Sequence, residues 1–197
     1  HVGPEKTQGV RVMTPGYASS GFSPRMYVEV DPDGTRTLRL RMSWGKGLRQ
    51  RDFTEAILRA ALRGARKAVV EGPVHLHAKT LAQAIPELRT LFCVCVAVDA
   101  SRPDVARLLQ PDPDGLLVDV KYPLVSDEDD RGREGFSRLA KGRFHPGRYR
   151  NRALETLERA EQCRLSAVRV WTHEWTVYDR ERTRQHLGGI QAPITWN

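Results

Sequence analysis

Cysteine is scarce in this chain, and long apolar runs are missing. Only three cysteines occur among 197 residues, and none of them forms a Cys-x-x-Cys pair. An odd, unpaired set argues against a disulfide framework and a zinc site, and it favours a reducing compartment. No apolar run approaches the roughly 20 residues that a membrane-spanning helix needs. We therefore expect a cytoplasmic protein that does not bind membranes.

Acidic residues are fewer than basic ones. The chain has 32 lysines and arginines against 24 acids, which gives a formal net charge of +8. Most of the cations are arginines, whose planar guanidinium binds phosphate in a bidentate manner. Such an excess favours a polyanionic partner, and nucleic acid is the expected one. The alternative is a basic protein that has no such partner.

The order of predicted elements indicates an α/β fold, with a central mixed β-sheet flanked by helices. Residues 1–24 are rich in Gly, Pro, Ser and Thr and are predicted to form a flexible arm, followed by a single α/β domain over residues 25–197. Alternating apolar residues around an Asp-Pro-Asp-Gly turn predict a hairpin over residues 26–44. Helices are predicted over residues 52–68, 79–90 and 150–164, and strands over residues 74–77, 92–98, 116–125 and 168–178.

One acidic motif precedes a turn, and a second lies on the strand that follows it. Pro103-Asp104 comes before a Pro/Asp/Gly turn, and the next strand carries Asp119-Val-Lys121. Residues two apart on a strand share a face, so the Asp119 and Lys121 side chains are predicted to point together. A hairpin over residues 104–121 would bring Asp104 beside them. Two carboxylates and an ammonium would then converge, as metal-assisted phosphodiester hydrolysis requires.

The order Pro103-Asp104, a gap, then Asp119-Val-Lys121 resembles the PD-(D/E)XK nucleases of the restriction-endonuclease-like superfamily. The resemblance covers residues 52–178 and implies a core of helix, three strands, helix and strand. It implies a Mg²⁺- or Mn²⁺-dependent nuclease, or nuclease subunit, that acts on DNA rather than RNA in defence, mobile-element processing or repair. Asp104 and Asp119 would ligate the metal, and Lys121 would orient the attacking water. The additional helical acid would be Glu55, with Glu87 as the alternative.

Residues 101–109 also fit a helix. Ser101 is a suitable N-cap, Pro103 suits the first turn, and the apolar residues that follow have helical spacing. In that case Asp104 is a first-turn acid favoured by the helix dipole, and it forms no site with Asp119. The sequence leaves the helix and the hairpin open.

A basic stretch with interleaved aromatic residues covers residues 136–152. Cations there are expected to bind phosphates while an aromatic ring stacks on an unpaired base. The alternative is a loop leading into a helix with a solvated face. The residues expected to bind nucleic acid are Arg138, Lys141, Arg143, Arg148, Tyr149, Arg150 and Arg152.

Other hypotheses account for some of these residues. His75 and His77 on one strand face, with Tyr149 as nucleophile, resemble the HUH nucleases, although two ordinary half-buried histidines explain the pattern better. Trp171 and Trp175 would share a face of the predicted strand 168–178 and are expected in the core. The main alternative to an enzyme is a non-catalytic nucleic-acid-binding subunit of a larger complex. A homodimer and a protein-interaction domain are also consistent with the sequence.

Overall fold

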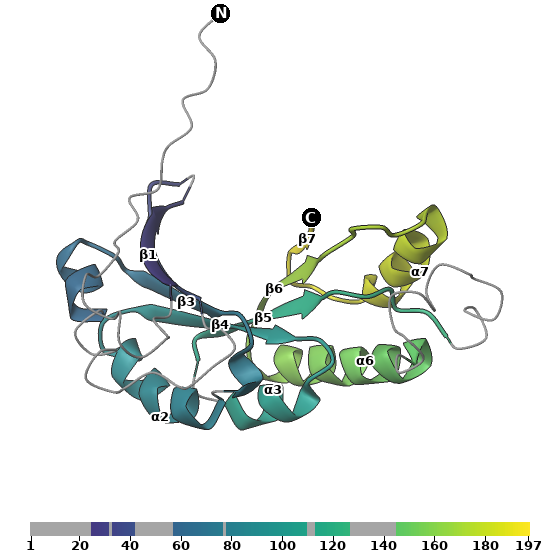
Figure 1. Cartoon of the computed structure of the whole chain (residues 1–197), viewed down its shortest axis with the longest axis horizontal. Helices are drawn as coiled ribbons and strands as arrows, with labels where there is room; N and C mark the ends of the chain where they lie inside the picture. Colours follow the sequence, from purple (N-terminus) through teal and green to yellow (C-terminus); the bar gives the residue numbers. More distant parts are fainter. Residues whose placement is uncertain (1–24, 32, 42–56, 77, 110–112, 127–144) are drawn as a thin grey trace, which may run out of the picture. The chain divides into compact units, whose positions relative to one another are not determined.

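The structure is a computed structural model that describes residues 25–31, 33–41, 57–76, 78–109, 113–126 and 145–197. The described strands form one mixed sheet in chain order, which confirms the predicted α/β class (Figure 1). The strands are β1 (Arg25–Val30), β2 (Arg36–Arg41), β3 (Lys67–Glu71), β4 (Cys93–Asp99), β5 (Gly115–Val120), β6 (Leu165–Val170) and β7 (Ile194–Trp196). The helices are a 3₁₀ turn η1 (Val74–Leu76), α2 (Ala78–Arg89), α3 (Pro103–Leu109), α6 (Pro146–Cys163) and α7 (Val177–Leu187).

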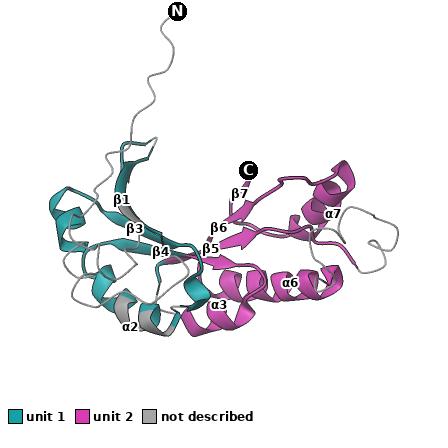
Figure 2. Cartoon of the chain, viewed as in Figure 1, with its two compact units in different colours: residues 1–96, 112–114 teal, residues 97–111, 115–197 magenta. Residues whose placement is uncertain are grey.

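The chain divides into two compact units (Figure 2). Unit 1 comprises residues 1–96 and 112–114, and unit 2 comprises residues 97–111 and 115–197. No helix in the described ranges is long and apolar enough to cross a membrane.

Unit 1 contains the predicted hairpin. β1 and β2 pair antiparallel, and Gly34 closes the turn by donating its N–H to the Asp31 carbonyl at 2.8 Å. Gly34 has a φ of 82°, which glycine adopts without the steric cost of a Cβ. β2, β3 and β4 continue the sheet in parallel. On α2 the buried residues Leu81, Ile85 and Leu88 recur at helical spacing, so the predicted helix 79–90 is confirmed.

Two predictions in unit 1 are wrong. The described part of the predicted helix, residues 57–62, ends at residue 62, and Gly64, with a φ of 84°, turns the chain away. Residues 67–71 therefore form β3 and do not continue the predicted helix 52–68. The valines of this segment are branched at Cβ, which favours a strand. The predicted strand 74–77 is instead the 3₁₀ turn η1.

In unit 2, α6 packs on one face of β5 and β6, and α3 packs against α6 (Figure 1). Both strand pairs of this unit, β5–β6 and β6–β7, are parallel. Along β5 the side chains of Leu116, Val118 and Val120 are buried, and Asp119 alternates with them on the opposite face. The predicted apolar stripe of α6 is confirmed by the burial of Ala153, Leu157 and Ala160.

Two further predictions are wrong in unit 2. Residues 103–109 form α3, so the hairpin over residues 104–121 does not exist and the helical alternative is confirmed. β6 ends at Val170, and the second half of the predicted strand 168–178 is replaced by a turn and the start of α7. A capping box starts α7: the Thr176 hydroxyl accepts the Asp179 N–H, and the Asp179 carboxylate accepts the Thr176 N–H. The start of α7 was not predicted because apolar residues alternate over residues 168–178, a pattern that favours a strand.

Candidate functional site

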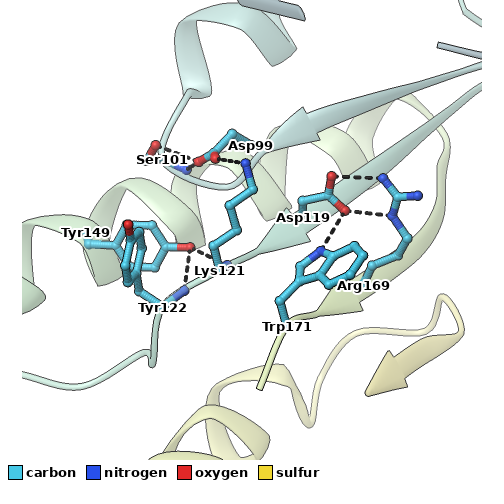
Figure 3. Close-up of polar contacts among 8 residues, drawn as sticks. All are labelled: Asp99, Ser101, Asp119, Lys121, Tyr122, Tyr149, Arg169 and Trp171. Carbon is cyan, nitrogen blue, oxygen red and sulfur yellow. Dashed lines mark hydrogen bonds and ion pairs between the residues drawn. The ribbon is translucent and has the colours of Figure 1, made fainter. Parts of the chain in front are cut away.

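A group of polar side chains gathers in unit 2 where three neighbouring strands end (Figure 3). Asp99 is the last residue of β4, Lys121 directly follows β5, and Trp171 directly follows β6. The backbone connects these ends, because Ala100 donates its N–H to the Asp119 carbonyl and Trp171 donates its N–H to the Val120 carbonyl. We call Asp99, Asp119, Lys121, Arg169 and Trp171 the carboxyl-end site.

The first ion pair of the site joins β5 to β6. Asp119 lies directly opposite Arg169 in the strand register. The Arg169 Nε and Nη2 donate to the two carboxylate oxygens of Asp119 at 2.6 and 2.8 Å, a bidentate arrangement. Only 19% of the Arg169 side chain and 13% of the Asp119 side chain are exposed. The same carboxylate accepts the indole N–H of Trp171 at 3.4 Å, which links the ring to this ion pair.

The second ion pair joins β4 to the residue after β5. The Lys121 ammonium lies 2.8 Å from the Asp99 carboxylate. Ser101 donates both its backbone N–H and its hydroxyl to the other oxygen of Asp99. Burial acts to raise the pKa of Asp99, but the hydrogen bonds and the charge of Lys121 outweigh it, so the pKa lies below its ordinary value. Asp99 therefore stays ionised, and Lys121 is held in place with 49% of its side chain exposed.

Tyr149 of α6 is hydrogen-bonded to the segment that follows β5. Its hydroxyl accepts the backbone N–H of Lys121 at 3.0 Å and that of Tyr122 at 3.4 Å. The rings of Tyr149 and Tyr122 meet edge to face. Burial raises the pKa of Tyr149, and the nearby negative charge of Asp99 adds to the effect, so the hydroxyl stays protonated. Tyr149 is 5% exposed, so it cannot stack on a base as the sequence predicted, and it positions the chain after β5 instead.

The structure brings Asp119 and Lys121 to the same strand end but does not add Asp104 to their hydrogen-bonded group. Asp104 lies in the first turn of α3, where its carboxylate pairs with Arg102 at 2.9 Å and 65% of the side chain is exposed. Glu55 lies outside the described residues. Lys121 instead pairs with Asp99, a carboxylate that the sequence hypothesis had not included, while Asp119 pairs with Arg169.

The predicted nucleic-acid-binding residues fall into two groups. Arg138, Lys141 and Arg143 lie outside the described residues. Arg148 and Arg152 are exposed in the first two turns of α6, where no acid occupies the first turn, and half-buried Arg150 donates to the Asn151 side chain. Their exposure is consistent with phosphate contacts as well as with a solvated face.

The structure also places the histidine pair. His75 lies in the 3₁₀ turn η1, and His77 lies outside the described residues. The strand that the HUH hypothesis required at this position is therefore missing, and the geometric basis of that hypothesis is lost.

The described residues do not fit a magnesium ion held by Asp104 and Asp119. Both oxygens of Asp119 are occupied by Arg169, whose charge already neutralises the carboxylate. Asp104 is likewise paired with an arginine. Within the described ranges no group of three His, Cys, Asp or Glu side chains is arranged to hold a metal ion. We therefore derive no chemical step through a metal.

Sequence patterns contained signals for the residues that the hypothesis missed. Asp99 ends the apolar run 92–98, and an acid at the carboxyl end of a buried strand is a typical site position. Arg169 and Trp171 have the same two-residue spacing as Asp119 and Lys121. The sequence does not show that β5 and β6 are neighbours, so the pairing of Asp119 with Arg169 is known only from the parallel register of these strands.

The carboxyl-end site presents one exposed cation next to one exposed aromatic ring. Lys121 and Trp171 follow the residues Val120 and Val170, which face each other in the register of β5 and β6. Trp171 is 44% exposed, and the Arg169 guanidinium lies 6.0 Å from its ring. An ammonium can bind an anion, and an indole can stack on a flat ring. In comparisons with known proteins, no family model and no curated protein matched the chain.

Proposed function

We propose that this protein binds nucleic acid at the carboxyl-end site, with Lys121 on a phosphate and Trp171 on a base. The observation that supports this most is that the exposed ammonium of Lys121 and the exposed indole of Trp171 directly follow two adjacent strands. Both are anchored by partly buried acids, Lys121 by Asp99 and Trp171 by Asp119. Anchoring lowers the entropy lost when a ligand binds, because the side chains are already ordered.

The position of the carboxyl-end site and the net charge of the chain also support this proposal. Ligands of parallel α/β sheets bind beyond the carboxyl ends of the strands. The net charge of +8 attracts a polyanion over a long range at low salt. We expect DNA as the nucleic acid, bound in the cytoplasm either by the chain alone or as a subunit of a larger complex.

Binding of fluorescent single-stranded oligonucleotides, measured by anisotropy at low salt, tests the proposal. We expect Trp171→Ala and Lys121→Met each to weaken binding by about tenfold, because stacking and a phosphate contact are each worth roughly 1–3 kcal/mol. Arg159→Met is the matched control, because it also removes one cation from unit 2, at a surface ion pair with Glu155 on α6. Equal affinities of all three variants and the wild type would refute the proposal.

Metal-dependent phosphodiester cleavage on a restriction-endonuclease-like core is the second candidate. It is favoured by the shared face of Asp119 and Lys121 at the end of β5, which is the spacing that the resemblance implies (Figure 3). Cleavage would require Asp119 to exchange Arg169 for a cation. Incubating the protein and DNA with Mg²⁺ or Mn²⁺ tests this: the hypothesis predicts cleavage that Asp119→Asn abolishes while binding persists. Binding without cleavage would leave the non-catalytic function.

A further inference from the structure

A second group of exposed aromatic and arginine side chains lies on α7 and β7. Tyr178 is exposed in the first turn of α7, and Trp196 is exposed in the edge strand β7. Each ring has an arginine of α7 beside it. We call Tyr178, Arg182, Arg184 and Trp196 the α7 surface.

Each of the two rings makes a cation–π contact with one of these arginines. The Arg182 guanidinium lies 5.3 Å from the centre of the Tyr178 ring, and its Nε donates to the Tyr178 hydroxyl at 2.9 Å. Arg184 lies 5.4 Å from the centre of the Trp196 ring and also pairs with Glu181. A guanidinium beside an exposed ring places a positive charge for a phosphate next to a surface on which a base can stack.

The packing of α7 does not account for the exposure of Tyr178. The buried positions of the helix are Asp179, Thr183 and Leu187, at spacing four, so polar groups occupy most of the inward stripe. The larger side chains Val177 and Tyr178 face solvent instead. A helix that served only to cover the sheet would bury such side chains.

The α7 surface is joined to the carboxyl-end site within unit 2. Trp171 is followed by Thr172, which donates its N–H and its hydroxyl to the carbonyl of Asn197, the residue after Trp196. On the other side, Leu124 donates its N–H to the buried Thr183 hydroxyl of α7 at 3.0 Å. The segments that carry Lys121 and Trp171 are therefore both hydrogen-bonded to the elements that carry the α7 surface.

We infer that the α7 surface is a second base-stacking platform, and that the ligand is single-stranded nucleic acid contacting both platforms. This rests on the proposed function of the carboxyl-end site. Bases in a duplex are stacked on one another and paired, so their faces are not open to two separate rings, whereas an unpaired strand offers every base face. Arg182 and Arg184 supply positive charge for the phosphates of such a strand beside the rings of the α7 surface.

The length of the oligonucleotide allows an experiment to distinguish this inference from the proposed function. A dinucleotide can occupy the carboxyl-end site alone, whereas contact with both platforms requires a longer strand. We choose a strand of about twelve nucleotides, within the usual size range of single-strand binding sites. We expect Trp196→Ala and Tyr178→Ala each to weaken binding of the long strand by about tenfold and to leave dinucleotide binding unchanged. Trp196→Phe keeps a stacking ring and is expected to retain most of the affinity. Leu108→Ala, which removes an exposed apolar side chain from α3, is the control.

A duplex of the same length is measured in the same anisotropy assay and is expected to bind at least tenfold more weakly than the single strand. Thermal unfolding of each variant confirms that it is folded. Unchanged long-strand binding by both α7 variants, or equal binding of duplex and single strand, would overturn the inference while leaving the proposed function intact if Lys121→Met and Trp171→Ala still weaken binding. Failure of the wild type to bind any of the strands would refute both.

Discussion

Two ion pairs lie on adjacent strand ends of the carboxyl-end site, and they differ in burial. Asp119 and Arg169 are joined by two hydrogen bonds, and less than a fifth of either side chain is exposed. Asp99 and Lys121 are joined by one contact, and about half of the Lys121 side chain is exposed. The first pair connects β5 with β6, and the second holds a cation at the surface.

Because the two ion pairs differ in burial, we assign them different roles. A largely buried, bidentate pair mainly fixes the strand register, and removing one partner leaves a charge with little water to solvate it. A half-exposed ammonium loses less of its hydration and can still reach an anion. We therefore expect Arg169 to matter most for stability and Lys121 to matter most for binding.

The largest expected effect comes from Arg169→Ala. This change leaves the Asp119 carboxylate without its two strongest donors in a mostly buried position. We expect the free energy of unfolding, measured by urea titration, to fall by about 2–3 kcal/mol. The double variant Asp119→Leu/Arg169→Met removes both charges and is expected to recover most of that loss. If the single and double variants were equally unstable, the cost would lie in packing and the assigned role of the pair would be wrong.

A smaller effect is expected from Tyr149→Phe. The phenylalanine keeps the ring but removes the oxygen that accepts the N–H groups of Lys121 and Tyr122. We expect a loss of about 1–2 kcal/mol in the free energy of unfolding. Because the segment after β5 is then less well fixed, oligonucleotide affinity should fall as well. A stability loss with unchanged affinity would show that Tyr149 does not position Lys121.

The Asp99–Lys121 pair should give a pH-dependent contribution of roughly 1 kcal/mol. The pKa of Asp99 is lowered below its ordinary value of 3.8, so the unfolded chain binds a proton more readily than the folded protein. The stabilisation is thus fully present above about pH 5 and is lost as pH falls through the lowered pKa. Urea unfolding of the wild type and Asp99→Asn between pH 6 and pH 2.5 measures it. The gap between the two proteins should close towards low pH, and a constant gap would contradict this account.

The smallest effect is expected at Asp104, which the sequence hypothesis had placed in the site. Arg102 and Asp104 form an exposed contact between residues two apart. We expect Asp104→Ala to change the free energy of unfolding by less than about 0.5 kcal/mol. It should leave oligonucleotide binding unchanged. A loss of metal-dependent cleavage in Asp104→Ala would instead support the nuclease hypothesis and move Asp104 back into the site.

Local patterns predicted the elements whose sequences had one dominant periodicity. The hairpin β1–β2, the helices α2 and α6 and the buried strand β4 have such patterns, and all four are present. The two-residue spacing also predicted the position of Asp119 and Lys121 at the end of one strand. These features depend on neighbours in sequence, which are visible without a structure.

Features that depend on distant partners were not predictable in this way. The segment 101–109 fits a helix and a strand, and only its packing as α3 against α6 decides between them. Asp119 was interpreted as a metal ligand because its partner Arg169, 50 residues away, could not be identified from the sequence. Trp171 was expected in the core because the strand was predicted to continue beyond Val170.

The salt dependence of single-stranded oligonucleotide binding by wild type and Lys121→Met tests the central claim most directly. A phosphate bound by Lys121 releases condensed counterions, so removing the ammonium should reduce the slope of log K against log salt by about 0.7, the value for one contact on a single strand. We predict this reduction for Lys121→Met and no change for Arg102→Met. Identical slopes for the wild type and both variants would contradict the assignment of Lys121 as a phosphate-binding residue.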